Sequence, residues 1–386
     1  MSDLKVYLIA GEPSGDLLGA RLMRSLVSKT KGHVCFCGVG GEAMEQEGLH
    51  SLFDISDLSV MGIWEVIPSI PRILRHIDEI IADIRNCQPD IVMTIDSYSF
   101  SSRVHKRLKK EGFLFPHVHC VAPQVWAWKK GRAKKISQFV DHLFCLLPGE
   151  EDYFKPHGME TTFIGHPVVE RGADKGNAKK FRQENNLSDE TLVLALLPGS
   201  RKNEIKYLLP IFKEVVTQLH QRIKDIFVVI PSVKTISDKV RQALIGWEVP
   251  YLIVEGEKNR YDAFAASNVA LAASGTVSLE LAMAGVPHLI AYKFSKLTGY
   301  LAKKLLKIRF VNLLNLIADK EVIPEILQDD CTVENVLTEL EKILKNPHQD
   351  TLPSLKRLGV GEKLSPSDKM AEKVLSLIEK ARHDRT

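Results

Sequence analysis

Short apolar runs of strand length recur along the chain, and each is followed by a segment with helical periodicity. The runs are almost continuously apolar, which is typical of parallel strands that are buried on both faces. Their alternation with helices predicts an α/β fold of the doubly wound type. The predicted strands are Val6–Ala10, Val34–Cys37, Ile91–Ile95, Val118–Val121, His142–Leu147 and Thr162–Ile164 in the first half, and Leu192–Leu197, Phe227–Ile230, Tyr251–Val254, Val269–Ala272 and Leu289–Tyr292 in the second.

The strand pattern breaks near residues 165–167 and resumes at Leu192, after a polar stretch. A chain of 386 residues is longer than one core usually supports. We therefore predict two Rossmann-like domains that face a cleft, residues 1–168 and residues 169–364. Residues 365–386 form a last helix that begins at Ser365-Pro366 with a capping-type start. Its apolar stripe predicts packing on the first domain or exchange between the subunits of a homodimer.

Helical periodicity is clearest between Pro71 and Arg85. Apolar residues recur there at the spacing of one helix face, which predicts a helix with one apolar stripe. The stripe consists of Ile73, Leu74, Ile77, Ile80, Ile81 and Ile84.

Composition and charge exclude several classes of protein. The formal net charge of +4 is too small to indicate a nucleic-acid-binding protein. The N-terminus lacks the pattern of a signal peptide, and no apolar run approaches the roughly twenty residues that span a bilayer. The six cysteines lack a paired C-x-x-C spacing, so we expect reduced, buried thiols of a cytosolic protein and no metal site.

The segment around residues 271–287 carries the strongest sign of chemistry. Ser274, Gly275 and Thr276 form a small-residue turn between a predicted strand and a helix that opens at Val277. A helix N-terminus has unpaired N–H groups and a partial positive charge, so this turn suits a phosphate. Glu280 lies one helical turn later, where its carboxylate could accept from a ribose diol. The alternative is an ordinary capped helix with an exposed glutamate.

Three further loops follow predicted strands. Arg201 ends the first strand segment of the second domain, and its fixed fork of donors suits a diphosphate. Asp96 ends a buried strand and is a candidate general base, with a helix N-cap as the alternative. The loop of residues 11–16 contains Ser14 and Asp16, either of which could cap the next helix, or the loop could face an acceptor.

Two other segments are less specific. Residues 38–43 match G-x-G-x-x-A, but the match follows the second strand rather than the first, so a nicotinamide site is not expected. The tryptophan-rich turn at residues 122–132 could bind the faces of sugars or anchor at a lipid headgroup layer. The segment Val60–Trp64 and the basic amphipathic helix Tyr300–Phe310 likewise suit an anionic membrane surface. Packed core residues with solvated lysines are the alternative.

Taken in order, these motifs resemble the lipid-A-disaccharide synthase family nearly end to end. The resemblance implies a glycosyltransferase of the GT-B type that inverts the anomeric centre without a cofactor or a metal. The landmarks are residues 11–16, 60–62, 95–96, 125–128, 164–166, 197–201, 273–276 with Glu280, and 312–316.

The resemblance also implies the partners and the location. The donor would be UDP-2,3-diacylglucosamine and the acceptor 2,3-diacylglucosamine 1-phosphate. The products would be the β-1,6-linked lipid A disaccharide and UDP. The enzyme would be cytoplasmic and peripheral on the inner face of the inner membrane. A UDP-sugar epimerase of the same fold and a non-catalytic lipid- or nucleotide-binding protein are the alternatives.

Residue roles follow from matching positions of the family pattern. Asp96 matches the family's essential acid. Two positions depart from the pattern: Ser99 stands where the family has a second acid, after Tyr98, and Pro13 stands where alanine is usual. The matched donor set is Arg201, Ser274, Gly275, Thr276, Glu280 and Asn315, and the matched acceptor-side loop contains Glu12, Ser14 and Asp16.

Overall fold

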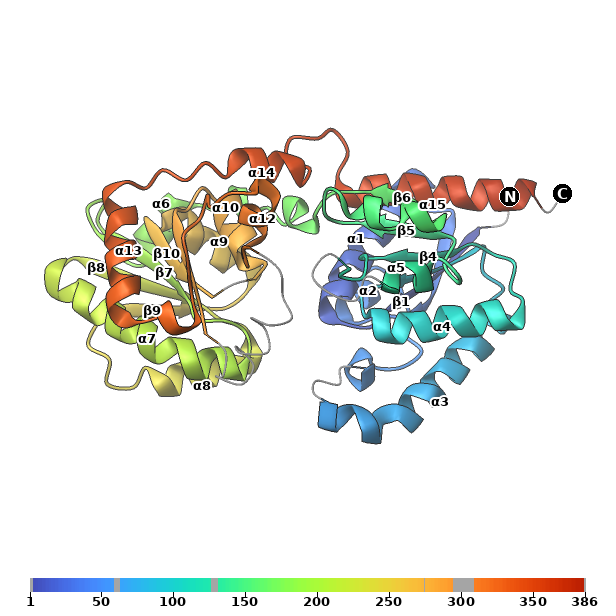
Figure 1. Ribbon diagram of the computed structural model, residues 1–386, viewed down its shortest axis with the longest axis horizontal. Coiled ribbons are helices and arrows are strands. Elements are labelled where there is room, and N and C mark those ends of the chain that lie inside the picture. The colour runs from blue at the N-terminus through green and yellow to red at the C-terminus, as the bar shows by residue number, and fades with distance from the viewer. Residues whose placement is uncertain (1–2, 59–62, 126–130, 274, 294–308, 385–386) are drawn as a thin grey trace. The chain divides into compact units, whose positions relative to one another are not determined.

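The computed structural model describes residues 3–58, 63–125, 131–273, 275–293 and 309–384 (Figure 1). The chain divides into two compact units. Unit 1 combines Met1–Pro167 with Gly361–Thr386, and unit 2 is Val168–Val360. Each unit contains one six-stranded parallel sheet.

The sheet of unit 1 has the strand order β2-β1-β3-β4-β5-β6. The chain leaves β1 toward one edge and returns to β3 on the other side, so the order reverses between β1 and β3. Ligands of open α/β sheets bind beyond the carboxyl ends of strands at such a switch point. The strands are β1 (Leu4–Ala10), β2 (Val34–Val39), β3 (Ile91–Ile95), β4 (His117–Cys120), β5 (His142–Cys145) and β6 (Glu160–Phe163).

Helices cover both faces of this sheet. Apolar residues of α1 and α15 share one core cluster with one face of the strands. Apolar residues of α3 and α4 form a second cluster on the opposite face. The helices of unit 1 are α1 (Pro13–Lys29), α2 (Glu42–Gln46), α3 (Ile63–Cys87), α4 (Tyr98–Glu111), α5 (Gly131–Ile136) and α15 (Pro366–His383).

The sheet of unit 2 has the order β12-β11-β10-β7-β8-β9, so its switch point lies between β7 and β10. Its strands are β7 (Leu192–Leu197), β8 (Ile226–Pro231), β9 (Tyr251–Val254), β10 (Val269–Ala272), β11 (His288–Tyr292) and β12 (Glu325–Leu327). Its helices are α6 (Ala178–Glu184), α7 (Lys202–Arg222), α8 (Lys234–Ala243), α9 (Glu257–Ala266), α10 (Val277–Met283), α12 (Leu313–Ala318), α13 (Val333–Lys345) and α14 (Leu352–Arg357).

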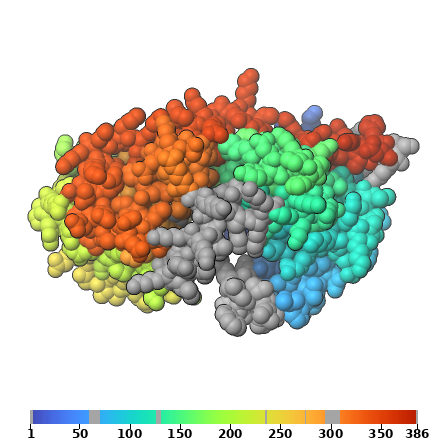
Figure 2. Space-filling view, viewed as in Figure 1, coloured from blue at the N-terminus to red at the C-terminus, as the bar shows by residue number. Residues whose placement is uncertain are grey.

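The main core of unit 2 joins α7, α8 and α13 to one face of the sheet. Phe212 of α7 and Leu340 of α13 are completely buried in it. In Figure 2 the orange-red segment that contains α13 covers much of the visible face of this unit.

The C-terminal helix α15 packs along α1 of the same chain, as Figure 1 shows. Ser365 accepts the N–H of Asp368, and Pro366 occupies the first turn, so the helix starts with the cap that the sequence predicted. Its buried stripe, which includes Met370 and Val374, belongs to the core of unit 1.

The structure contains the eleven predicted strands and corrects three details. The short strand β12 was missed, because three residues are too few to show a pattern. Leu74 is 52% exposed and lies off the buried stripe of α3, because its position turns away from the face that contacts the sheet. Cys35 is exposed rather than buried, since β2 lies at the edge of its sheet.

None of the helices in the described part of the chain is both long and apolar enough to cross a bilayer.

Candidate functional site

The switch point of unit 1 brings the first loop against the end of β3. The Ser14 hydroxyl donates to Oδ2 of Asp96 at 2.9 Å, and the N–H of Ser97 donates to Oδ1 at 2.8 Å. The Ser97 hydroxyl donates to Oε1 of Glu12 at 2.9 Å. Glu12 and Ser14 are exposed and Asp96 is half-buried. Two loops far apart in sequence thus hold one accessible carboxylate in a defined orientation.

The backbone at this point is strained. Asp96 and Ser97 both have positive φ angles, 61° and 45°. Non-glycine residues rarely adopt this conformation, and they cluster where function requires it. The opposing loop must come close, because a Cβ at Gly11 would lie 2.6 Å from Cβ of Ser97. Glycine at position 11 therefore permits the contact between the two loops.

Asp16 has a different place from the one expected. Neither Ser14 nor Asp16 caps α1, because the helix already begins at Pro13. The buried Asp16 carboxylate instead accepts the N–H groups of Gly41, Ala43 and Met44 at 2.8 to 3.0 Å. Asp16 thus ties the first loop to the start of α2, which is a positioning role.

The switch point of unit 2 begins with the turn after β7. The Glu204 carboxylate accepts the N–H groups of Ser200 and Arg201 through Oε2, at 2.8 and 3.2 Å. Its Oε1 accepts the hydroxyl of Tyr292 at 2.9 Å. Gly199 has a φ of 111°, and a Cβ there would lie 2.3 Å from Oε2 of Glu204. The turn is therefore built around an internal carboxylate.

This arrangement leaves the Arg201 side chain 69% exposed at the carboxyl end of the strand. Its guanidinium lies 3.6 Å from Glu204. Sequence reasoning missed Glu204, although its place three residues after the helix N-cap is the position where a glutamate commonly reaches back. Burial of the Tyr292 phenol raises its pKa to about 12, and the neighbouring Glu204 carboxylate, to which the phenol donates, raises that pKa further.

The turn after β10 leads into α10 at Val277, as predicted. Gly275 and Thr276 are exposed, and Gly275 has a φ of 147°. Ser274 lies outside the described residues. Glu280 is only 2% exposed and is paired with two arginines, Arg171 and Arg260. Its carboxylate is therefore not the solvent-exposed group of an ordinary capped helix.

Asn315 is fully buried in unit 2, and its amide is used inside the protein. The side-chain NH₂ donates to the carbonyl of Ile323 and to Glu325, and the side-chain oxygen accepts from Val322 and Ile323. An asparagine amide has two donors and one oxygen with two acceptor positions, so this set fills it. We therefore expect Asn315 to hold its segment in place rather than to contact a ligand directly.

Three segments singled out in the sequence lie wholly or mostly outside the described residues. Val60–Gly62 and Trp126–Trp128 are outside, and so is the basic helix Tyr300–Phe310 except for its last two residues. The side chain of Trp64 is outside as well.

Unit 1 also contains several buried titratable groups in its interior. The Thr94 hydroxyl lies 2.8 Å from Nε2 of His105 and 2.7 Å from Nδ1 of His119. Burial lowers the pKa of His119 to about 4 and lowers that of His105 as well. Burial raises the pKa of Glu150 to about 7, although the N–H groups that it accepts act in the opposite direction.

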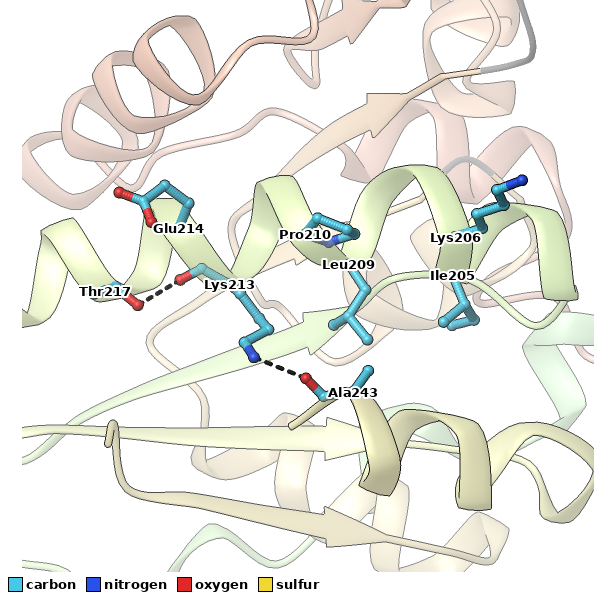
Figure 3. A pocket seen from close by; sticks show the side chains of 8 residues that line it. All are labelled: Ile205, Lys206, Leu209, Pro210, Lys213, Glu214, Thr217 and Ala243. Carbon is cyan, nitrogen blue, oxygen red and sulfur yellow. Dashed lines mark hydrogen bonds between the residues drawn. The ribbon is translucent and has the colours of Figure 1, made fainter. Parts of the chain in front are cut away.

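A pocket of about 450 Å³ lies between α7 and the end of α8 (Figure 3). None of the predicted site residues lines it, so the two switch points, rather than this pocket, locate the candidate site. Among the described residues, no group of three or more His, Cys, Asp or Glu side chains could hold a metal ion. The pocket is lined by Ile205, Lys206, Leu209, Pro210, Lys213, Glu214, Thr217 and Ala243.

Comparisons with known proteins agree on family and on fold. The family described as lipid-A-disaccharide synthetase matches residues 6–378. The lipid-A-disaccharide synthase of Rhodospirillum centenum is 43% identical over 386 residues, which cover 98% of this chain and 96% of that protein. The enzyme of the same name from Paramagnetospirillum magneticum is also 43% identical, over 98% of this chain and 99% of the relative.

Two solved structures illustrate the fold. A UDP-GlcNAc 2-epimerase from Neisseria meningitidis has a TM-score of 0.61 at 12% identity, over 97% of this chain and all of the other. MurG from Acinetobacter baumannii has a TM-score of 0.55 at 14% identity, over 98% of this chain and 99% of the other. At such low identity the likeness shows the fold alone, with two Rossmann-like domains of the GT-B type.

Proposed function

Because the chain belongs to the lipid-A-disaccharide synthase family, we propose that its two switch points divide one glycosyl transfer between them. The protein is a glycosyltransferase that forms the lipid A disaccharide. Family membership implies a UDP-sugar donor and a monosaccharide lipid acceptor. In the proposal, unit 1 activates the acceptor and unit 2 holds the nucleotide.

The proposed donor is UDP-2,3-diacylglucosamine, and the proposed acceptor is 2,3-diacylglucosamine 1-phosphate. Both carry acyl chains, so the protein would work at an anionic membrane surface, on the inner face of the inner membrane. The alternating lysines and leucines of Tyr300–Phe310 in the sequence support this location, because basic amphipathic segments bind such surfaces.

Asp96 is the proposed general base. The 6-hydroxyl of the acceptor attacks the anomeric carbon of the donor from the face opposite UDP, and Asp96 takes the hydroxyl proton. The new bond joins O6 to C1, and the bond from C1 to the diphosphate oxygen breaks. The contacts with Ser14 and with the N–H of Ser97 support this role, since a base must be held at a fixed position near the proton it removes.

Arg201 and the turn at Gly275–Thr276 are the proposed diphosphate contacts, with Ser274 as the third member of the turn. Charge builds on the diphosphate as the bond to C1 breaks. An arginine cannot lose its proton, so Arg201 stabilises that charge throughout the reaction. The observation that carries the proposal is the exposed Arg201 guanidinium at one switch point and the oriented Asp96 carboxylate at the other.

A UDP-sugar epimerase is the competing function with the same fold. Its support is the structural likeness to a UDP-GlcNAc 2-epimerase at 12% identity, which concerns the fold alone. The sequence relatives at 43% identity are disaccharide synthases, so epimerisation is not favoured.

One assay tests the proposed chemistry. The purified chain is incubated with the diacylated donor and acceptor in detergent micelles, and the products are separated by mass spectrometry. We expect disaccharide 1-phosphate and UDP in equal amounts. An epimerised UDP-sugar without disaccharide would contradict the proposal, and so would binding of both substrates without turnover.

A further inference from the structure

We propose that Arg171 and Arg260 are positioning residues that fix the carboxylate of Glu280 for recognition of the donor's ribose. This inference rests on the proposed function, because it assigns the nucleotide to the switch point of unit 2. Neither arginine belongs to a motif that the sequence singled out. The structure brings them to Glu280 from segments that lie 109 and 20 residues away along the chain.

Both arginines contact the same oxygen of Glu280. Nη1 of Arg171 lies 2.8 Å from Oε1, and Nη2 of Arg260 lies 3.3 Å from it. The Glu280 side chain is 3% exposed, whereas the arginines are 21% and 26% exposed. A carboxylate buried this deeply is costly without a cationic partner, and here two cations compensate it. Because both arginines contact Oε1, we assign the contact with the ribose hydroxyls to Oε2.

The segment that carries Arg171 is seated firmly on unit 2. Arg171 follows the short 3₁₀ helix Pro167–Glu170, and the next one, Ala173–Lys175, packs against α9 and α10. A Cβ at Gly176 would lie 1.9 Å from the carbonyl oxygen of Tyr261 in α9, so only glycine permits this approach. The N–H of Asn177 donates to Asp262 at 2.8 Å. The position of Arg171 is thus set by the backbone around it.

Arg260 is held in the first turn of α9. Its guanidinium lies 5.1 Å from the ring centroid of Tyr261, in a cation–π contact. The hydroxyl of Tyr261 donates to Glu257 at 2.8 Å, which fixes the ring. The Nε atom of Arg260 is buried and has no hydrogen-bond partner within the described residues. A buried donor of this kind calls for an acceptor, and a ribose oxygen beside Glu280 would supply one.

The consequence is specific to the sugar of the nucleotide. With both arginines in place, Glu280 keeps one orientation and presents Oε2 to the ribose. Without them, the carboxylate would turn away, and the ribose contact would weaken. The diphosphate contacts through Arg201 and the Gly275–Thr276 turn would remain. The arginines therefore matter for ribose recognition more than for binding of the phosphates.

Calorimetric titration of the full chain with UDP and with 2′,3′-dideoxy-UDP tests this difference. We expect the wild-type chain to prefer UDP by about 10- to 100-fold, the worth of a hydrogen bond to a charged group. E280Q should lose most of this preference. R171Q/R260Q should weaken UDP binding by about tenfold or more, with little change for the dideoxy nucleotide.

R222Q is the matched control, because Arg222 pairs with Glu341 on the surface of unit 2. It should keep the wild-type preference. Melting temperatures report whether each variant folds. If R171Q/R260Q is destabilised, R171K/R260K serves instead, because it keeps both charges. Its preference for UDP over the dideoxy nucleotide should lie between those of the wild type and of R171Q/R260Q.

An unchanged preference in folded R171Q/R260Q would overturn the proposal, and so would an equal loss of affinity for both nucleotides. Equal binding of both nucleotides by the wild type would remove the ribose role of Glu280 and the proposal with it. A wild-type chain that binds neither nucleotide would instead contradict the donor site of the proposed function.

Discussion

Unit 1 and unit 2 end their central strands at switch points of the same kind, but they place opposite charges there. In unit 1 the carboxylates of Glu12 and Asp96 reach the surface and are held by serine hydroxyls and one backbone N–H. In unit 2 the carboxylates of Glu204 and Glu280 are buried and already paired. What remains exposed in unit 2 is the guanidinium of Arg201.

The difference shows that an acid at a strand end has no fixed role. An acid that is oriented but accessible can take a proton, as proposed for Asp96. An acid that is buried and neutralised shapes its loop and lets a neighbouring cation face the ligand. Under the proposed function, the same arrangement of sheet and helices would supply a base in one unit and an anion site in the other, because the internal pairing of the acids differs.

The largest expected effect comes from removing the base. D96N should lower turnover by about 10²- to 10⁴-fold, because the amide cannot take the proton of the acceptor hydroxyl. The affinity for UDP should stay unchanged, because the proposed nucleotide contacts all lie in unit 2. Steady-state kinetics and UDP titration measure the two effects, with the surface variant D152N as control, since Asp152 is 79% exposed. Near-normal turnover of D96N would remove the base assignment.

The converse variant in unit 2 should affect binding as well as rate. R201A should lower kcat/KM by about 10²- to 10³-fold, because the guanidinium stabilises the charge that develops on the diphosphate. It should also weaken UDP binding, which D96N does not. R222A, at the far end of the helix that follows Arg201, provides the matched control. An unchanged UDP dissociation constant in R201A would place the diphosphate elsewhere.

Acid should destabilise the two units unequally. Burial lowers the pKa of His119 and His142 in unit 1 to about 4, and it lowers that of His288 in unit 2 equally. The unfolded chain binds these protons near pH 6.5, so stability falls as the pH drops from about 6.5 toward 4. Each of these histidines should lower the free energy of unfolding by about 2 kcal/mol at pH 5 relative to pH 7.

Unit 1 contains two more histidines of this kind, His105 and His117, whose pKa values burial also lowers. Glu150 has the opposite effect on stability. Its pKa is raised to about 7, so the folded unit binds this proton at a higher pH than the unfolded chain does. The histidines outnumber Glu150, so unit 1 should lose more stability than unit 2 between pH 7 and pH 5. Hydrogen exchange measured by mass spectrometry at pH 7 and pH 5 compares the units, and equal protection losses would contradict the expectation.

The smallest expected effect concerns the orientation of Asp96. S14A removes the hydroxyl that donates to Oδ2, which is worth about 1 kcal/mol, or roughly fivefold in kcat. KM for the donor should not change. S232A, at the half-buried residue after β8 in unit 2, is the control. A higher KM for the acceptor with an unchanged kcat would indicate that Ser14 contacts the acceptor instead of positioning the base.

The sequence predicted the strands well for a physical reason. Parallel strands covered on both faces must be apolar throughout, and such runs are visible without an alignment. It also predicted the start of α10 at Val277, because small residues before a helix leave a local signature. The role expected for Asn315 had no such basis, and the structure shows an amide whose bonds are filled internally.

Local pattern therefore determined the α/β class, the two sheets and the loops that carry Asp96 and Arg201. Only the tertiary structure decided which polar groups remain accessible. Glu204 and Glu280 look as accessible in the sequence as Asp96 does, yet they are buried against backbone N–H groups and arginines. Pairing depends on contacts between segments up to 109 residues apart, such as Arg171 and Glu280, and no local pattern encodes such a contact.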